Sequence, residues 1–282
     1  MKKQKSITNL LIHLFLAFVV IIWVLPIVWI IIISFRAEQG AYTSTILPRS
    51  YTLNNYISLF TDKSLFDFPL WFRNTFIVAC FSCIISTFYT LSVSYVMSRI
   101  RFKMRKKFMN IALILGMFPG FMSMIAVYYI LKGVGLTTGA LKLVALVLVY
   151  SGGAGLAFYV AKGFFDTISK SIDEAACIDG CTKWQVFTKI TIPLSKPIIV
   201  QTVLSAFITP WMDFIFAKVI SGSESQYYTV AIGLWNMLEK ENITNYYTRF
   251  AAGAVIVSIP IAILFCSMQK YYMENNSGAV KG

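Results

Sequence analysis

Five long stretches of this chain contain no aspartate, glutamate, lysine or arginine. They cover residues 10–35, 74–98, 108–131, 143–161 and 250–269, and a sixth stretch, residues 197–217, is interrupted only by Asp213. A run of about 18 or more apolar residues is long enough for a helix to cross a bilayer. Because backbone polar groups inside lipid must be satisfied within the segment, each stretch is expected to be helical. We therefore expect an all-α integral membrane protein with six transmembrane helices.

The composition fits this class. Hydrophobic residues make up 57% and charged residues 13% of the 282-residue chain, and its mean hydropathy is +0.70. Soluble domains carry about one-quarter charged residues. The first stretch has 26 residues and no small-residue cleavage site. We interpret it as a transmembrane helix and not as a signal peptide.

Lysine and arginine are shared unequally between alternate connecting segments, with 16 on one side and nine on the other. Positive residues favour the cytoplasmic side, so both termini are predicted to be cytoplasmic. This topology explains the net charge of +13 without a nucleic-acid partner. We predict four regions. Residues 1–35 hold a cytoplasmic tail and the first transmembrane helix, 36–69 an extracytoplasmic loop, 70–270 a transmembrane core and 271–282 a cytoplasmic tail. Within the core, residues 166–196 form a cytoplasmic loop and residues 221–248 an outer loop.

The cytoplasmic loop carries signals for two short helices. Ser171 and Glu174 have the spacing of a capping box, which predicts a helix that starts near Ile172. Gly180 can end this helix in the left-handed conformation. A second capping-box pair, Thr182 with Gln185, predicts another helix, which Pro193 would end.

The first of these helices has a face suited to a partner protein. Ile172, Ala175, Ala176 and Asp179 recur at three- and four-residue spacings, so they form a small apolar face that can enter a groove. Asp173 and Glu174 would then meet basic or amide groups at the rim of that groove. The alternative interpretation is an ordinary solvated loop helix.

Catalytic chemistry is poorly supported by the sequence. His13 is the only histidine and lies inside the first apolar stretch, and Cys80 and Cys83 have C-x-x-C spacing within another. No metal site is predicted, because the ligands that such a site requires are missing. No glycine precedes a lysine, so the phosphate-binding loop G-x-x-x-x-G-K is absent. We expect a non-catalytic subunit that binds no cofactor.

Three residues in the apolar stretches are candidates for a translocation path. Asp213 is an acidic residue in a spanning segment, where it would face a partner or a water-filled path; it would equally fit the outer membrane interface. Gly152 and Gly153 begin a run of small residues, which favours either a close helix contact or a substrate surface.

The loop also carries a family resemblance. Glu174-Ala175-Ala176, three residues and Gly180, followed by Ile190-Thr191-Ile192-Pro193-Leu194, resemble the EAA loop of ABC importer permeases. The resemblance extends over nearly the whole chain, with further matching segments at Tyr95–Phe102, Tyr228–Leu234 and Ser277–Gly282. The chain is similar to the binding-protein-dependent sugar permeases, and among them to the smaller permease subunit of maltose/maltodextrin transporters.

The resemblance implies the type I importer fold in the plasma membrane of a prokaryote. It implies a second permease subunit, an ATPase dimer that carries ATP and magnesium, an extracytoplasmic sugar-binding protein and an oligosaccharide substrate. Maltodextrin is the expected substrate; galacto-oligosaccharides, another glycan or a non-sugar solute are alternatives, and a membrane-embedded enzyme is the competing class. The resemblance also implies three sets of contacts. The loop would contact the ATPase through Asp173, Glu174, Ala175, Ala176, Asp179, Gly180 and Pro193, and the tail would contact the ATPase through Gly278, Val280, Lys281 and Gly282. The binding protein would be contacted by Glu239, Lys240, Glu241 and Asn242.

Overall fold

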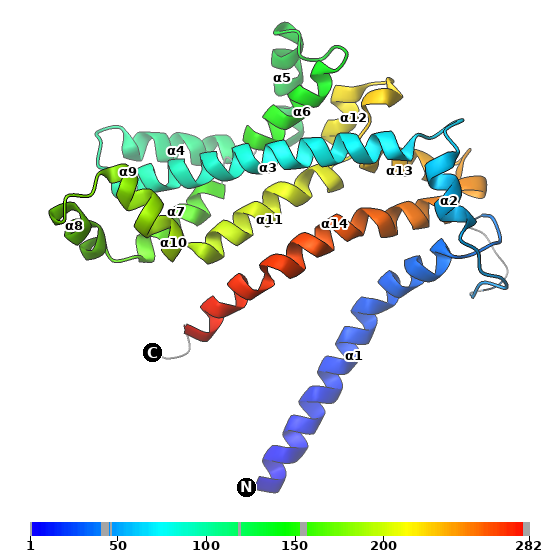
Figure 1. Cartoon of the computed structure of the whole chain (residues 1–282), viewed down its shortest axis with the longest axis horizontal. Coiled ribbons are helices and arrows are strands. Elements are labelled where there is room, and N and C mark those ends of the chain that lie inside the picture. The colour runs from blue at the N-terminus through cyan, green and yellow to red at the C-terminus, as the bar shows by residue number, and fades with distance from the viewer. Residues whose placement is uncertain (1, 41–44, 46, 118–119, 153–156, 279–282) are drawn as a thin grey trace. The chain divides into compact units, whose positions relative to one another are not determined.

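The computed structural model describes residues 2–40, 45, 47–117, 120–152 and 157–278. Within these residues the chain is helical and has no strand; its one β-bridge joins Arg36 to Tyr51. Figure 1 labels the helices. They are α1 (Lys2–Ser34), α2 (Asn54–Thr61), α3 (Phe68–Arg99), α4 (Arg105–Gly116), α5 (Gly120–Gly133), α6 (Leu141–Gly152), α7 (Ala157–Thr167), α8 (Lys170–Ile178), α9 (Lys183–Val186), α10 (Ile192–Leu194), α11 (Lys196–Met212), α12 (Ile215–Ser221), α13 (Val230–Leu238) and α14 (Ile243–Gly278), with a π-turn at Phe187–Thr191 and a 3₁₀ turn at Ser225–Tyr227.

Four helical segments within the described residues are long and apolar enough to cross a membrane. They are Asn9–Ser34, Phe68–Arg99, Leu141–Thr167, which includes the undescribed residues 153–156, and Ile243–Tyr271. A fifth is formed if Lys183–Leu194 and Lys196–Met212, bent by 85° at their junction, are counted as one span. A multi-pass helical membrane protein is therefore confirmed, and the number six stays a prediction.

Two predicted spans are broken into shorter helices. Residues 108–131 form α4 and α5 instead of one helix: Gly116 ends α4 and Gly120 begins α5. Glycine disfavours a helix interior and proline removes a backbone donor. Pro119, which is outside the described residues, lies between the two glycines in the sequence. The stretch 197–217 is divided at Asp213, which ends α11.

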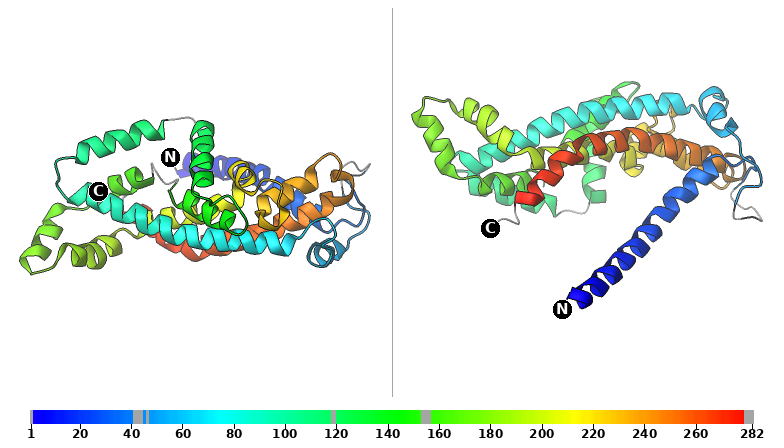
Figure 2. Two further views of the ribbon diagram at one scale, coloured as in Figure 1. Left: turned by 90° about the horizontal axis from the view of Figure 1, so that it is seen from above. Right: turned by 60° about the horizontal axis from the view of Figure 1, so that its bottom comes forward.

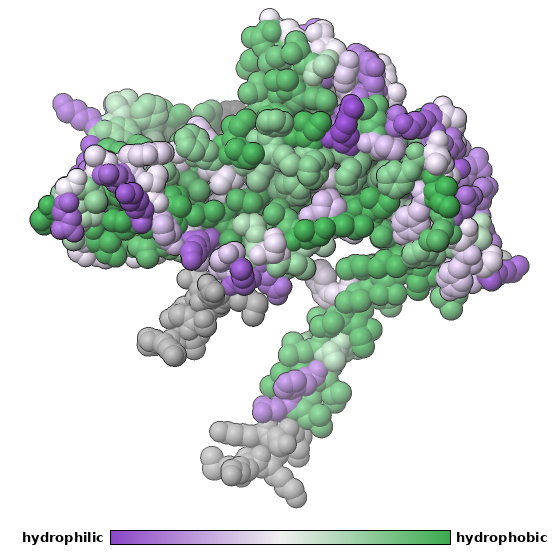
Figure 3. All heavy atoms as spheres, viewed as in Figure 1, coloured by the Kyte–Doolittle hydropathy of each residue, from purple (hydrophilic) through white to green (hydrophobic). Residues whose placement is uncertain are grey.

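The chain divides into two units, Met1–Pro69 with Gly233–Ser258 and Leu70–Ile232 with Ile259–Gly282. In the first unit α1 leaves nearly all its apolar side chains exposed, as around Phe18, which is 61% exposed. Figure 3 shows this apolar surface along α1. Such a surface is expected to face lipid.

The second unit packs around α3. One face of this helix has a small polar residue at every fourth position, and all of them are buried: Ser82, Ser86, Thr90, Ser94 and Ser98. Small side chains let helix backbones approach closely. Ser94 Oγ donates to the carbonyl oxygen of Phe158 on α7 at 2.9 Å, and Cys83 Sγ lies 3.5 Å from the carbonyl oxygen of Val203 on α11. This face therefore holds α7 against α3, and the neighbouring position Cys83 contacts α11.

Candidate functional site

The candidate site is the helical loop formed by α8, α9, the π-turn and α10, which lies beside the carboxyl ends of α3 and α7 in all views of the second unit (Figures 1 and 2). Its first helix begins two residues earlier than predicted. Ser169 is the N-cap, and its hydroxyl accepts a hydrogen bond from the backbone N–H of Ser171. The predicted cap at Ser171 with Glu174 is therefore wrong, because Ser169, with ψ 132°, is the last residue outside the helical conformation and makes the capping hydrogen bond.

The elbow between the two short helices is built as predicted. Gly180 has φ +86°, a conformation that costs other residues about 1–2 kcal/mol. Thr182 and Gln185 form the predicted capping box, since each side chain accepts a hydrogen bond from the other residue's backbone N–H. The helical run passes through Pro193 and ends at Leu194. The π-turn Phe187–Thr191 precedes Pro193 and accommodates its ring, which would clash with the carbonyl group four residues earlier in a regular helix.

An apolar cluster fixes the base of this loop. Leu91 and Tyr95 of α3, Phe165 of α7, Phe187 of the π-turn and Ile198 of α11 are all buried in it. The rings of Tyr95 and Phe187 lie 4.7 Å apart, and the hydroxyl of Tyr95 donates to the backbone carbonyl of Lys183 at 3.2 Å. The loop is thus a packed extension of the helical core.

Arg99, at the end of α3, joins the loop to α7. Its Nη2 donates to the carbonyl oxygens of Phe165 and Ile168 at 2.9 and 2.8 Å, where the carboxyl end of α7 favours a cation. Its Nε lies 3.1 Å from Oδ2 of Asp173 on α8, with the two side chains 4% and 13% exposed. Asp173 is therefore engaged inside the chain and does not lie at the outer surface of α8.

The outward face of α8 differs from the predicted face, because Ala176 and Asp173 turn inward and Ile178 turns outward. Ala176 is buried at 7% exposure and packs inward, which corrects its assignment to the docking face. The outward positions are Ile172, Glu174, Ala175, Ile178 and Asp179. Ile178 is 86% exposed, because the helix turns this residue away from the apolar cluster. An isoleucine so exposed at the tip of a loop favours contact with a partner.

Basic side chains gather beside this face. Arg101, Arg105, Lys170 and Lys183 line a hollow of about 520 Å³ together with Arg99 and the acidic pair Asp173 and Glu174. The Nζ of Lys183 lies 3.3 Å from Sγ of Cys177. The loop therefore presents an apolar tip flanked by a predominantly cationic hollow.

Asp213 lies at a second hollow of the same unit. Its Oδ2 accepts a hydrogen bond from the hydroxyl of Tyr150 at 2.6 Å, and its Oδ1 accepts one from the backbone N–H of Phe216 at 3.2 Å. Both residues line this hollow of about 660 Å³. Gly152 lines an adjoining, largely apolar hollow that shares Val149 and Phe216 with the hollow at Asp213; Gly153 lies outside the described residues.

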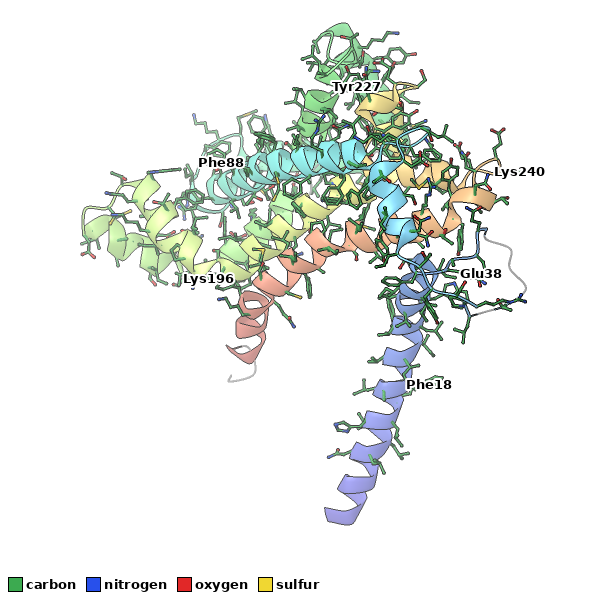
Figure 4. All side chains as sticks on the ribbon, turned by 45° about the vertical axis from the view of Figure 1, so that its right-hand side comes forward. Phe18, Glu38, Phe88, Lys196, Tyr227 and Lys240 are labelled. Carbon is green, nitrogen blue, oxygen red and sulfur yellow. The ribbon has the colours of Figure 1, made fainter. Side chains whose placement is uncertain are left out.

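The predicted binding-protein contact lies at the turn between α13 and α14, within the first unit. Glu239, Lys240 and Glu241 are exposed there, and Asn242 is half-buried, with its side-chain amide donating to the carbonyl oxygen of Asn236 at 2.9 Å. Figure 4 shows Lys240 at this turn.

An ion pair in the same unit ties α14 to the end of α2. Arg249 Nη1 lies 2.7 Å from Oδ2 of Asp62. Hydrogen bonds from the hydroxyl of Ser64 and from Arg249 lower the pKa of Asp62 from 3.8 to about 2. Of the predicted tail contacts, Gly278 ends α14, and Val280, Lys281 and Gly282 lie outside the described residues.

Sequence reasoning does not identify two residues that shape the loop, Arg99 of α3 and Ile178 of α8. In the sequence, Arg99 belongs to a basic segment and to the resemblance at Tyr95–Phe102, and its place at the end of an apolar helix is the signal for a capping role. Ile178 was passed over as a spacer between the alanines and Gly180, although an isoleucine in a polar loop is itself a signal of contact.

Residues 89–272 match the family described as binding-protein-dependent transport system inner membrane component. This match spans more than half of the chain and contains the whole helical loop. The chain belongs to this family. Among the relatives of this inner membrane component, the galactooligosaccharides transport system permease protein GanQ of Bacillus subtilis is 32% identical over 100% of the chain and 99% of the relative. The maltodextrin permease MdxG of the same organism is 30% identical over 96% and 95%, and the maltose/maltodextrin permease MalG of Escherichia coli is 30% identical over 100% and 98%.

A solved structure shows the same fold. The bacterial ABC transporter involved in the import of the acidic polysaccharide alginate contains a chain that matches with a TM-score of 0.78 and 22% identity, over 95% of this inner membrane component and 98% of that chain. The type I permease fold implied by the sequence is therefore confirmed.

Proposed function

We propose that this chain is a permease subunit of an ATP-driven, binding-protein-dependent importer of neutral oligosaccharides. The observation that carries the proposal is the family match over residues 89–272, which includes a rigid loop with an exposed apolar tip. Galacto-oligosaccharides and maltodextrins are the substrate classes to test first, because relatives named for each are about equally similar, at 32% and 30% identity.

In this proposal the chain pairs with a second permease in a prokaryotic plasma membrane. Six spans place both termini and the helical loop in the cytoplasm, and the turn Glu239–Asn242 faces the binding protein outside. ATP and magnesium are bound by a separate ATPase dimer. Its closure acts on the permease through the loop, where Ile178 and Ala175 enter a groove and Glu174 and Asp179 meet its rim. The tail residues 278–282 supply an additional contact with the motor.

Uptake measurements test this function. Cells with and without the gene are given radiolabelled maltotriose and β-1,4-galactotriose, and we expect one of the two to accumulate only when the chain is present. Equal uptake in both strains for a panel of neutral oligosaccharides would refute a sugar permease. Deletion of residues 278–282 should lower sugar-stimulated ATP hydrolysis without affecting membrane insertion; unchanged stimulation would remove the tail from the mechanism.

Topology is tested separately. Single cysteines at Ser169 and Ser223, both exposed, are placed in a variant whose five native cysteines are replaced. Ser223→Cys should react with a membrane-impermeant maleimide from outside, and Ser169→Cys only after the membrane is opened. Reaction of both from the same side would refute the six-span arrangement.

A further inference from the structure

A polar stripe runs along α11 and continues to the residue that ends it. Gln201, Ser205, Thr209 and Asp213 follow one another at four-residue spacing, so they share one slowly turning helix face about 18 Å long. All four line the hollow of about 660 Å³ described above. Of the four, Gln201, Ser205 and Thr209 are exposed on the surface of the chain. We call these three residues the α11 stripe.

The α11 stripe has free hydrogen-bonding capacity. Within the described residues, the side chains of Gln201 and Ser205 make no hydrogen bond. The Thr209 hydroxyl donates to the carbonyl oxygen of Ser205 at 2.8 Å, which leaves its lone pairs free to accept. A polar group in a membrane segment is costly unless it finds a partner. The stripe therefore requires water, a ligand or another chain on its open side.

The wall opposite the stripe is apolar. Val149 of α6 and Ala157 and Val160 of α7 line it together with the aromatic rings of Tyr150 and Phe216, and Ser86 of α3, the one further polar side chain from outside α11 among the described residues, is buried. A pyranose unit has hydroxyl groups around its edge and C–H groups on its faces, so a hollow with one hydroxyl-bearing side and one apolar side matches both of its surfaces. A helix of a second permease is the alternative occupant, since Ser, Thr and Gln side chains also hydrogen-bond between transmembrane helices, and the experiment below distinguishes the two.

The charge in the hollow favours a neutral sugar. No lysine or arginine is among the described residues that line it, and Asp213 contributes a carboxylate. This carboxylate is occupied by Tyr150 and Phe216, so Asp213 positions the outer end of the hollow and is not free to bind a sugar hydroxyl. Its negative charge opposes the entry of a carboxylated glycan, because repulsion between like charges is weakly screened away from water.

We propose that the α11 stripe binds the hydroxyl groups of a neutral oligosaccharide during passage, so that this subunit itself selects its substrate and disfavours acidic glycans. This inference rests on the proposed function, and it adds a binding site on this chain. It is tested by affinity, because uptake also depends on the binding protein. The complete permease and ATPase complex in nanodiscs, without binding protein, is titrated with whichever of maltotriose and β-1,4-galactotriose is taken up, and binding is followed by saturation-transfer NMR.

Three variants each remove one donor or acceptor: Gln201→Leu, Ser205→Ala and Thr209→Val. Loss of one hydrogen bond should raise the Kd about two- to tenfold. The matched control is Ser258→Ala, which removes the same hydroxyl from an exposed site on α14 and should leave the Kd unchanged. Trigalacturonate should compete at least tenfold more weakly than the neutral trisaccharide.

The inference is overturned if all three variants keep the wild-type Kd, or if trigalacturonate competes equally well. It is also overturned if the variants lose the second permease on purification, since the stripe would then be a helix interface. In each of these cases wild-type uptake persists and the proposed function stands. Failure of uptake itself would refute the proposed function.

Discussion

Replacing Arg99 with methionine should loosen the helical loop while leaving the rest of the second unit folded. The substitution keeps most of the side-chain length and removes the charge. It leaves the 13%-exposed carboxylate of Asp173 without its cation and deprives the carbonyl oxygens of Phe165 and Ile168 of a donor. Removing one partner of a buried ion pair costs about 3–5 kcal/mol. Since Asp173 is partly exposed and shares its hollow with other cations, we expect the lower value, about 3 kcal/mol.

Hydrogen exchange on the protein in nanodiscs can measure this cost. A local loss of about 3 kcal/mol corresponds to an increase of about 100-fold in the exchange rate of the amides of α8. Arg101→Met is the matched control, because Arg101 is exposed on the adjacent turn, and its exchange rates should stay within a few-fold of wild type.

The double variant Arg99→Met, Asp173→Leu separates the pair from the rest of the arginine's contacts. It should exchange more slowly than Arg99→Met alone, because no uncompensated carboxylate remains. If Arg99→Met leaves α8 exchange unchanged, the ion pair does not hold the loop. If the double variant is no better than the single one, the carbonyl contacts alone explain the effect.

Three further predictions concern the loop and the first unit. Gly180→Val should destabilise the elbow by about 1–2 kcal/mol through backbone strain and so speed the hydrogen exchange of the α8 amides. Glu174→Ala, at an exposed site that caps no helix, should leave this exchange unchanged. Equal exchange in both variants would refute the elbow's role. Ile178→Ser should reduce ATPase co-purification at least fivefold while membrane levels stay constant, and undiminished co-purification would remove this residue from the interface. Because the pKa of Asp62 falls to about 2 on folding, its contribution to stability is present above about pH 4 and lost as the pH falls toward 2. Thermal unfolding of the nanodisc-embedded protein between pH 5 and pH 2 should show a falling unfolding temperature, and the Arg249→Gln variant should show a smaller fall.

Local sequence signals predicted the elbow of the loop well. The glycine at position 180 and the capping box of Thr182 with Gln185 act over a few residues, so their chemistry can be recognised without knowledge of the fold. The start of α8 was misplaced because Ser169 and Ser171 are both suitable caps. Only the surrounding structure decides between them, since it sets where the chain leaves α7.

Contacts between distant parts of the chain were beyond sequence reasoning. Arg99 and Asp173 are separated by 73 intervening residues, and nothing in either segment identifies the other. Helical periodicity likewise grouped Ala176 with Ile172 but could not show which side of α8 faces the core. The polar spacing on α11 is visible in the sequence, yet its meaning depends on the hollow that α3, α6, α7 and α12 form beside it.

The bend between the loop and α11 has a mechanical consequence. The helical run Lys183–Leu194 and the helix Lys196–Met212 meet at 85°, and Ser195 at the corner is fully buried. Packing of Phe187 and Ile198 into one cluster braces both arms of this corner. A rigid L-shaped element converts displacement of its short arm into rotation of its long arm. A push on the loop would therefore swing the polar face of α11, and by reciprocity a sugar held on that face would bias the position of the loop before any nucleotide is hydrolysed.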